Sequence, residues 1–134
     1  MKKIITITLL AFAMGPFFSE DSLAQSQNIE GNFIHAVYFW LKNPDSKTDR
    51  EKFEKSLTNF IQNSENITGK HIGLPAKTDR DVIENSYTYS LVLSFKNKEM
   101  QDKYQVEPGH LKFIEECKDL WNKVIVYDSE NMLK

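Results

Sequence analysis

FIHAVYFWLK, residues 33–42, decides the fold of this chain, because its side chains fall into two alternating sets. The first set is Phe33, His35, Val37, Phe39 and Leu41; the second is Ile34, Ala36, Tyr38 and Trp40. Successive side chains on a strand point to opposite faces of a sheet. Since both sets are largely apolar, the stretch predicts a strand that is covered on both sides.

The rest of the chain continues this first strand in a fixed order of elements. Thr48, with Glu51 three residues later, fits a capping box and predicts the start of a helix that ends by Asn66. Further along, the patterns predict strands over 70–74 and 86–95, helices over 97–104 and 110–120, and a strand over 121–128. The order is βαββαβ, which predicts an α+β domain with a ferredoxin-like antiparallel sheet.

Such a sheet has its helices on one side and leaves the other face bare. Because both sets of the first strand are largely apolar, that face carries large aromatic and aliphatic groups, which need a partner. Two copies packed sheet to sheet would bury the face and form a dimeric α/β barrel. We therefore expect a homodimer, with room for a small apolar ligand in or beside the sheet.

The first residues of the chain have the pattern of an export signal. Met1-Lys2-Lys3 is basic, Ile4 to Phe18 is nearly all apolar, and Ser22-Leu23-Ala24 places small residues where a signal peptidase cuts. We expect residues 1–24 to be a signal peptide, 25–31 a disordered lead-in and 32–130 the folded domain. Cleavage after Ala24 would give a periplasmic or secreted protein without stable membrane insertion; an uncleaved anchor is the alternative.

Composition excludes several classes of function. The chain has 17 basic and 19 acidic side chains, so nucleic-acid binding through phosphate neutralisation has no support. Its only cysteine, Cys117, has Phe113, Ile114 and Leu120 at helical spacing, which favours a buried core thiol over a nucleophile. Phosphate-binding glycine loops and serine nucleophile motifs are missing, which argues against nucleotide-dependent chemistry. We expect no cofactor.

Three positions could carry acid–base chemistry. His35 falls among apolar neighbours, where it is either a satisfied core imidazole or a base in a cavity. His110 follows Pro108-Gly109 at the start of a helix, where free backbone donors favour a neutral imidazole. Tyr104 lies across the same break and could place its hydroxyl beside His110.

The remaining histidine and tyrosines have plainer interpretations. His71 is expected to be exposed at a strand edge, and the spacing of the three histidines matches no local metal motif. Tyr87 and Tyr89 are expected on one face of the third strand, either as core aromatics or as pocket-lining groups.

The chain resembles the stress-responsive A/B barrel (Dabb) family. The likeness rests on the first strand, on the stretch from Tyr87 to Phe95, and above all on Tyr104-x-x-x-Pro108-x-His110-x-x-Phe113. The resemblance implies a ferredoxin-like dimer whose sheets form a shared barrel. This chain has Glu107 where family members commonly have His before the proline.

The family includes a plant polyketide cyclase that closes a ring by aldol condensation, and its site residues match Tyr104, His110 and His35; a third-strand histidine of the cyclase is Tyr89 here. The resemblance implies His110 as general base and Tyr104 as oxyanion donor, with His35 catalytic and Tyr89, Phe39 and Phe113 binding substrate. The reaction would be proton abstraction, aldol-type cyclisation or lyase chemistry on a small carbonyl compound. The alternative is a non-enzymatic, stress-related binding protein for a small hydrophobic ligand. A haem-binding relative is a third class, but no feature marks an axial ligand.

Overall fold

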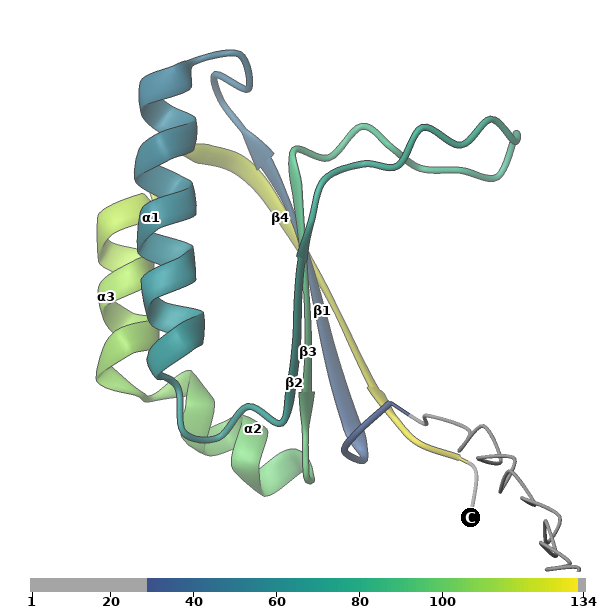
Figure 1. The fold of residues 1–134 in the computed structure, drawn as a ribbon, viewed down its shortest axis with the longest axis vertical. Coiled ribbons are helices and arrows are strands. Elements are labelled where there is room, and N and C mark those ends of the chain that lie inside the picture. Colours follow the sequence, from purple (N-terminus) through teal and green to yellow (C-terminus); the bar gives the residue numbers. More distant parts are fainter. Residues whose placement is uncertain (1–28, 133–134) are drawn as a thin grey trace, which may run out of the picture.

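The computed structural model describes residues 29–132, so the predicted signal peptide lies outside the described residues. Four strands form one antiparallel sheet in the order β2-β3-β1-β4, and three helices pack on one of its faces (Figure 1). This is the predicted ferredoxin-like arrangement. The elements are β1 (Phe33–Leu41), α1 (Lys47–Asn63), β2 (Gly69–Gly73), β3 (Tyr89–Phe95), α2 (Lys98–Gln105), α3 (Pro108–Cys117) and β4 (Trp121–Glu130).

β1 lies in the middle of the sheet and follows the predicted alternation. Its burial alternates strictly between buried and half-buried residues, starting with buried Phe33. The buried set faces the helices, while the set with Tyr38 and Trp40 lies on the opposite side, which we call the open face. On that face β1 pairs Tyr38 with Ile125 of β4 and Ala36 with Val92 of β3.

The helix starts differ from those predicted. α1 is capped by Ser46, whose hydroxyl accepts a hydrogen bond from the Asp49 backbone N–H at 3.3 Å, whereas Thr48 lies inside the helix. The capping box was therefore placed two residues late, because Ser46 and Thr48 offer the same side-chain chemistry. α3 begins at Pro108 rather than His110, since proline suits the first helical position, where no N–H is needed.

The third strand is shorter than predicted, and Tyr87 lies on the other face from Tyr89. The regular pairing of β1 and β3 ends at Phe39 and Tyr89. Beyond it, the Leu41 N–H donates to the Thr88 hydroxyl at 3.0 Å instead of to a backbone carbonyl. This interception breaks the alternation, so the Tyr87 ring packs against Tyr38 on the open face.

The core lies between the sheet and the helices. Phe53 and Leu57 of α1, Leu93 and Phe95 of β3 and Cys117 of α3 are all fully buried and belong to this core. Burying each large apolar side chain contributes about 1.5–3 kcal/mol. Cys117 thus fills the core as predicted, and burial raises the pKa of its thiol.

Residues 74–87, between β2 and β3, form a long connection that we call the arm. The arm extends from the sheet on the side away from the helices (Figure 1), and most of its residues are exposed, with Val82 at 87%. At the other end of the sheet, the Glu30 carbonyl accepts a hydrogen bond from Thr68, and Gly31, at φ 98°, packs on the Phe95 carbonyl. The last residues of the expected lead-in therefore contact the domain. No helix within 29–132 is long and apolar enough to span a membrane.

Candidate functional site

His35, Tyr104 and His110 meet on the helix side of the sheet. β1 supplies His35, the last turn of α2 supplies Tyr104, and the first turn of α3 supplies His110. The ring centroids of His35 and Tyr104 lie 5.7 Å apart, and those of Tyr104 and His110 lie 4.9 Å apart. The three residues singled out in the sequence for acid–base chemistry thus form one cluster, with Tyr104 at its centre. We call it the His–Tyr–His cluster.

His35 is held by a carboxylate that sequence reasoning missed. Its Nδ1 atom lies 2.6 Å from Oδ1 of Asp128, the residue opposite it in β4. The His35 side chain is 6% exposed, while that of Asp128 is 45% exposed. Because a carboxylate accepts a hydrogen bond there, the Nδ1–H tautomer is favoured and Nε2 keeps its lone pair. Only the β1–β4 register could have revealed this pair.

His110 has the same tautomer for a different reason. Its Nδ1 atom lies 2.9 Å from the backbone carbonyl of Gln105, which can only accept, so Nδ1 carries the proton and Nε2 is free to act as a base. The ring is half-buried against Phe60. Burial is the main cause that lowers the pKa of His110, and His35 adds to it. Burial therefore favours the neutral imidazole at pH 7, whereas the sequence pointed to the free backbone donors of the helix start as the cause.

The hydroxyl of Tyr104 is suited to donate a hydrogen bond. It is 1% exposed, and burial raises the pKa of its hydroxyl, with further contributions from the charges of Glu107 and Asp128. Within residues 29–132, this hydroxyl has no protein hydrogen bond, and no fully buried side-chain oxygen or nitrogen lacks a partner. The hydroxyl therefore reaches solvent and stays protonated, so it can donate to a ligand oxygen.

Glu107 places a negative charge at the edge of the cluster. Its Oε1 atom accepts hydrogen bonds from the Ser64 hydroxyl, at 3.0 Å, and from the Asn66 side-chain amide. These two hydrogen bonds link the segment after α1 to the start of α3. The Glu107 charge acts to raise the pKa of both Tyr104 and His110, so in His110 it opposes the effect of burial.

Tyr89, Phe39 and Phe113, predicted to bind substrate, lie in a second group of rings around Phe53. The ring of Tyr89 stacks on that of Phe53 at 4.8 Å, and Phe39 and Phe113 meet the same ring edge-on. The Tyr89 hydroxyl donates to Glu54, and burial raises its pKa. The structure does not bring Tyr89 to the His–Tyr–His cluster. A role for these three residues in substrate binding stays a prediction.

His71 is exposed on the edge strand β2, as predicted. Across the described part of the chain, no group of three His, Cys, Asp or Glu residues is placed to hold a metal ion.

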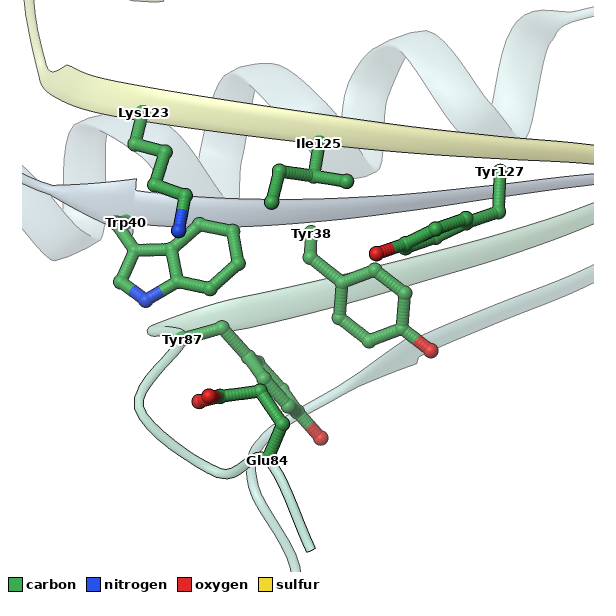
Figure 2. Close-up of a pocket in the computed structure, with 7 residues that line it drawn as sticks. All are labelled: Tyr38, Trp40, Glu84, Tyr87, Lys123, Ile125 and Tyr127. Carbon is green, nitrogen blue, oxygen red and sulfur yellow. The ribbon is translucent and has the colours of Figure 1, made fainter. Parts of the chain in front are cut away.

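A pocket of about 440 Å³ lies on the open face, where the arm returns to the sheet (Figure 2). β1 and β4 form its floor and the end of the arm forms its wall. Seven residues line it: Tyr38, Trp40, Glu84, Tyr87, Lys123, Ile125 and Tyr127. Sequence reasoning predicted an aromatic open face but missed this pocket, because it depends on Tyr87 leaving the expected strand face.

Comparisons with known proteins agree with this architecture. The family model described as the stress responsive A/B barrel domain matches residues 33–131. A Dabb family protein with a ferredoxin-like fold from Mesorhizobium loti is 17% identical, with a TM-score of 0.63 over 77% of this chain and 99% of that one. No curated protein matches the chain.

Two further solved structures share the fold. A dimeric ferredoxin-like protein of unknown function from Thermobifida fusca is 13% identical, with a TM-score of 0.61 over 78% of this chain and 95% of that one. A hydroxynitrile lyase from Passiflora edulis is 16% identical, with a TM-score of 0.62 over 78% of this chain and 97% of that one. At these identities the likeness concerns the fold alone.

Proposed function

Because this chain belongs to the stress-responsive A/B barrel (Dabb) family, we propose that it is a homodimer whose His–Tyr–His cluster transfers protons on a small carbonyl compound. The observation that carries the proposal is the meeting of Tyr104 with two imidazoles. Each imidazole has its Nδ1 proton fixed by an acceptor, so each presents an unprotonated Nε2. One hydroxyl donor between two bases is a set suited to acid–base catalysis.

Each residue has a defined role in the proposed reaction. Nε2 of His110 removes a proton from the carbon next to the carbonyl group. The Tyr104 hydroxyl donates a hydrogen bond to the carbonyl oxygen, on which negative charge develops. Protonated His110 then returns this proton to the product, and His35, oriented by Asp128, is a second base. The product is an enol or enolate, which can then attack a second carbonyl group in an aldol-type closure.

Lyase chemistry uses the same set of groups. The neighbour from Passiflora edulis is a hydroxynitrile lyase on this fold. A base that removes the proton of a hydroxyl group next to a nitrile needs the same neutral imidazole. We therefore include hydroxynitriles among the substrate classes for this chain.

The test is a screen of aldehydes, ketones and hydroxynitriles, followed by two matched pairs of variants. We expect Tyr104→Phe and His110→Ala each to reduce kcat/KM by about 10²-fold or more. Tyr127→Phe, on the open face, and His71→Ala, on the edge strand β2, make the same chemical changes away from the cluster and should leave turnover intact. Turnover that survives both cluster substitutions would show that the reaction takes place elsewhere.

The homodimer is supported by the open face and by relatives that are described as dimeric. Export to the periplasm or the medium is supported by residues 1–24 alone. The expected result is a mature protein that begins at Gln25, established by N-terminal sequencing of the exported fraction. A chain that retains Met1 in the membrane fraction would favour the anchor instead.

A second candidate is a binding protein that holds a small hydrophobic molecule at the same cluster. Apolar rings favour it, because Phe60 and Phe95 pack against Tyr104 at 5.3 and 5.0 Å. Native mass spectrometry of the exported protein tests this candidate. A copurified apolar molecule, lost in Tyr104→Ala and never converted to a product, would support binding over catalysis.

A further inference from the structure

The open-face pocket is built differently from the His–Tyr–His cluster. Its walls are aromatic rings set nearly at right angles: Tyr38 to Tyr87 at 70°, Tyr38 to Tyr127 at 74° and Trp40 to Tyr87 at 84°. Figure 2 shows these rings around a shared space on the open face of β1 and β4. Rings at right angles present their electron-rich faces from several directions, which is the arrangement that surrounds a quaternary ammonium group.

A hydrogen-bonded chain fixes one side of the pocket. The Trp40 indole N–H donates to the Ser86 hydroxyl at 2.9 Å, and the Ser86 backbone N–H donates to the Glu84 carboxylate at 2.7 Å. The Ser86 side chain is the main cause that lowers the pKa of Glu84, and the Ser86 backbone N–H and the Lys123 charge add to it. The pocket wall therefore carries a negative charge that is linked through Ser86 to the Trp40 indole.

The pocket already attracts a cation from its own chain. The Lys123 ammonium lies 4.2 Å from the centroid of the Trp40 ring, and its charge also attracts the Glu84 carboxylate, without a close ion pair between the two. An exposed contact of this kind is weak, and a lysine side chain is long and mobile. A ligand cation can therefore displace Lys123 into water.

We propose that this pocket binds a small organic cation of the quaternary-ammonium class, held by the ring faces of Tyr38, Trp40 and Tyr87 and by the charge of Glu84. Its volume of about 440 Å³ lies in the range of small-molecule sites. With Lys123 displaced, Glu84 is the one charged group left in the lining, which matches a single positive charge. The site is separate from the proposed reaction. In the proposed dimer, the partner subunit faces this pocket across the open face.

The test uses choline as the probe and 3,3-dimethylbutan-1-ol, its uncharged isostere, as the matched control. The two tryptophans give two indole N–H signals in a ¹H–¹⁵N spectrum, assigned with Trp40→Phe. We expect choline to shift the Trp40 signal and to leave that of Trp121, which packs on Phe39 and Phe113 on the helix side. Equal shifts from the isostere, movement of both indoles alike, or no shift would overturn the proposal.

Two charge variants sharpen the test. Glu84→Gln should weaken choline binding and Lys123→Met should strengthen it, each by roughly two- to fivefold. Lys118→Met removes the same charge at the end of α3, where Lys118 pairs with Glu115, and should leave binding unchanged. Weaker binding in Lys123→Met, or binding unaffected by Glu84→Gln, would contradict the proposed cage. Sedimentation of each sample establishes that binding is measured on the assembled protein.

Discussion

Nδ1 of His35 and Oδ1 of Asp128 lie 2.6 Å apart, across two strands that place these residues directly opposite each other. The partners are unequal, because the imidazole is buried and the carboxylate is half-exposed. The carboxylate therefore fixes which nitrogen of a buried ring carries the proton, while the ring's second nitrogen remains available to the cluster.

Asp128→Asn tests this orientation. An amide can offer its N–H to Nδ1, which would stabilise the opposite tautomer and remove the lone pair from Nε2. We expect the imidazole ¹⁵N shifts of His35 to change from the Nδ1–H pattern, and turnover of any identified substrate to fall about 10²-fold or more. Glu130→Gln, on the same face of β4, is the control. An unchanged tautomer in Asp128→Asn would contradict the orienting role.

The stability of the fold should depend on pH through His110. Burial lowers the pKa of this residue below its ordinary 6.5, so the unfolded chain takes up a proton at a higher pH than the folded one. The contribution of His110 is complete above 6.5 and is lost as pH falls through the lower folded pKa. We expect the free energy of unfolding in urea to fall between pH 7.5 and pH 5.0, and to fall less for His110→Gln than for the native chain. For His71→Gln, which changes an exposed ring, the free energy of unfolding should fall as much as for the native chain.

Phe53 should be among the most costly core positions to truncate. It is fully buried, and its ring meets those of Phe39, Tyr89 and Phe113 within 5.7 Å. Phe53→Ala should lower the free energy of unfolding by about 3–5 kcal/mol in urea titrations. Val82→Ala, at the exposed arm, should change it by less than about 0.5 kcal/mol. A loss at Phe53 no larger than at Val82 would mean that the core is packed otherwise.

The open face should hold the dimer together. Val92 lies on this face opposite Ala36, so Val92→Asp places a charge in the proposed interface while the helix side keeps its packing. Sedimentation velocity at micromolar concentration should show a dimer for the native chain and a monomer for Val92→Asp. Leu111→Asp, at an exposed position of α3, should remain dimeric. A native chain that sediments as a monomer would refute the homodimer.

Local patterns predicted most of the fold because they act over neighbouring residues. The alternation in residues 33–41 predicted β1 and its two sets of side chains, and the spacing around Cys117 predicted a buried thiol. The misplacements at Thr48 and Tyr87 have local causes as well. Ser46 competed as a cap, and the Thr88 hydroxyl took the bond that would have extended β3.

The His–Tyr–His cluster and the open-face pocket were harder to predict, because they depend on pairing between residues far apart in the chain. The sequence indicated Tyr104 and His110, which are close along the chain, and marked His35 as an unusual strand residue. Asp128 could not be singled out, because it is one of several polar residues near the end of β4 and only the register brings it to His35. The aromatic pocket was missed for the same reason, since Glu84 reaches it through the course of the arm.

The arm also determines where a protease can cleave this protein. Residues 74–87 carry Lys77 and Arg80 in an exposed stretch outside the sheet, so trypsin has two accessible bonds between β2 and β3. A chain cut there keeps β2 paired with β3 and β3 paired with β1, so the two fragments stay associated without a covalent link. The arm is therefore the natural point at which to divide the protein into complementing halves or to insert a reporter.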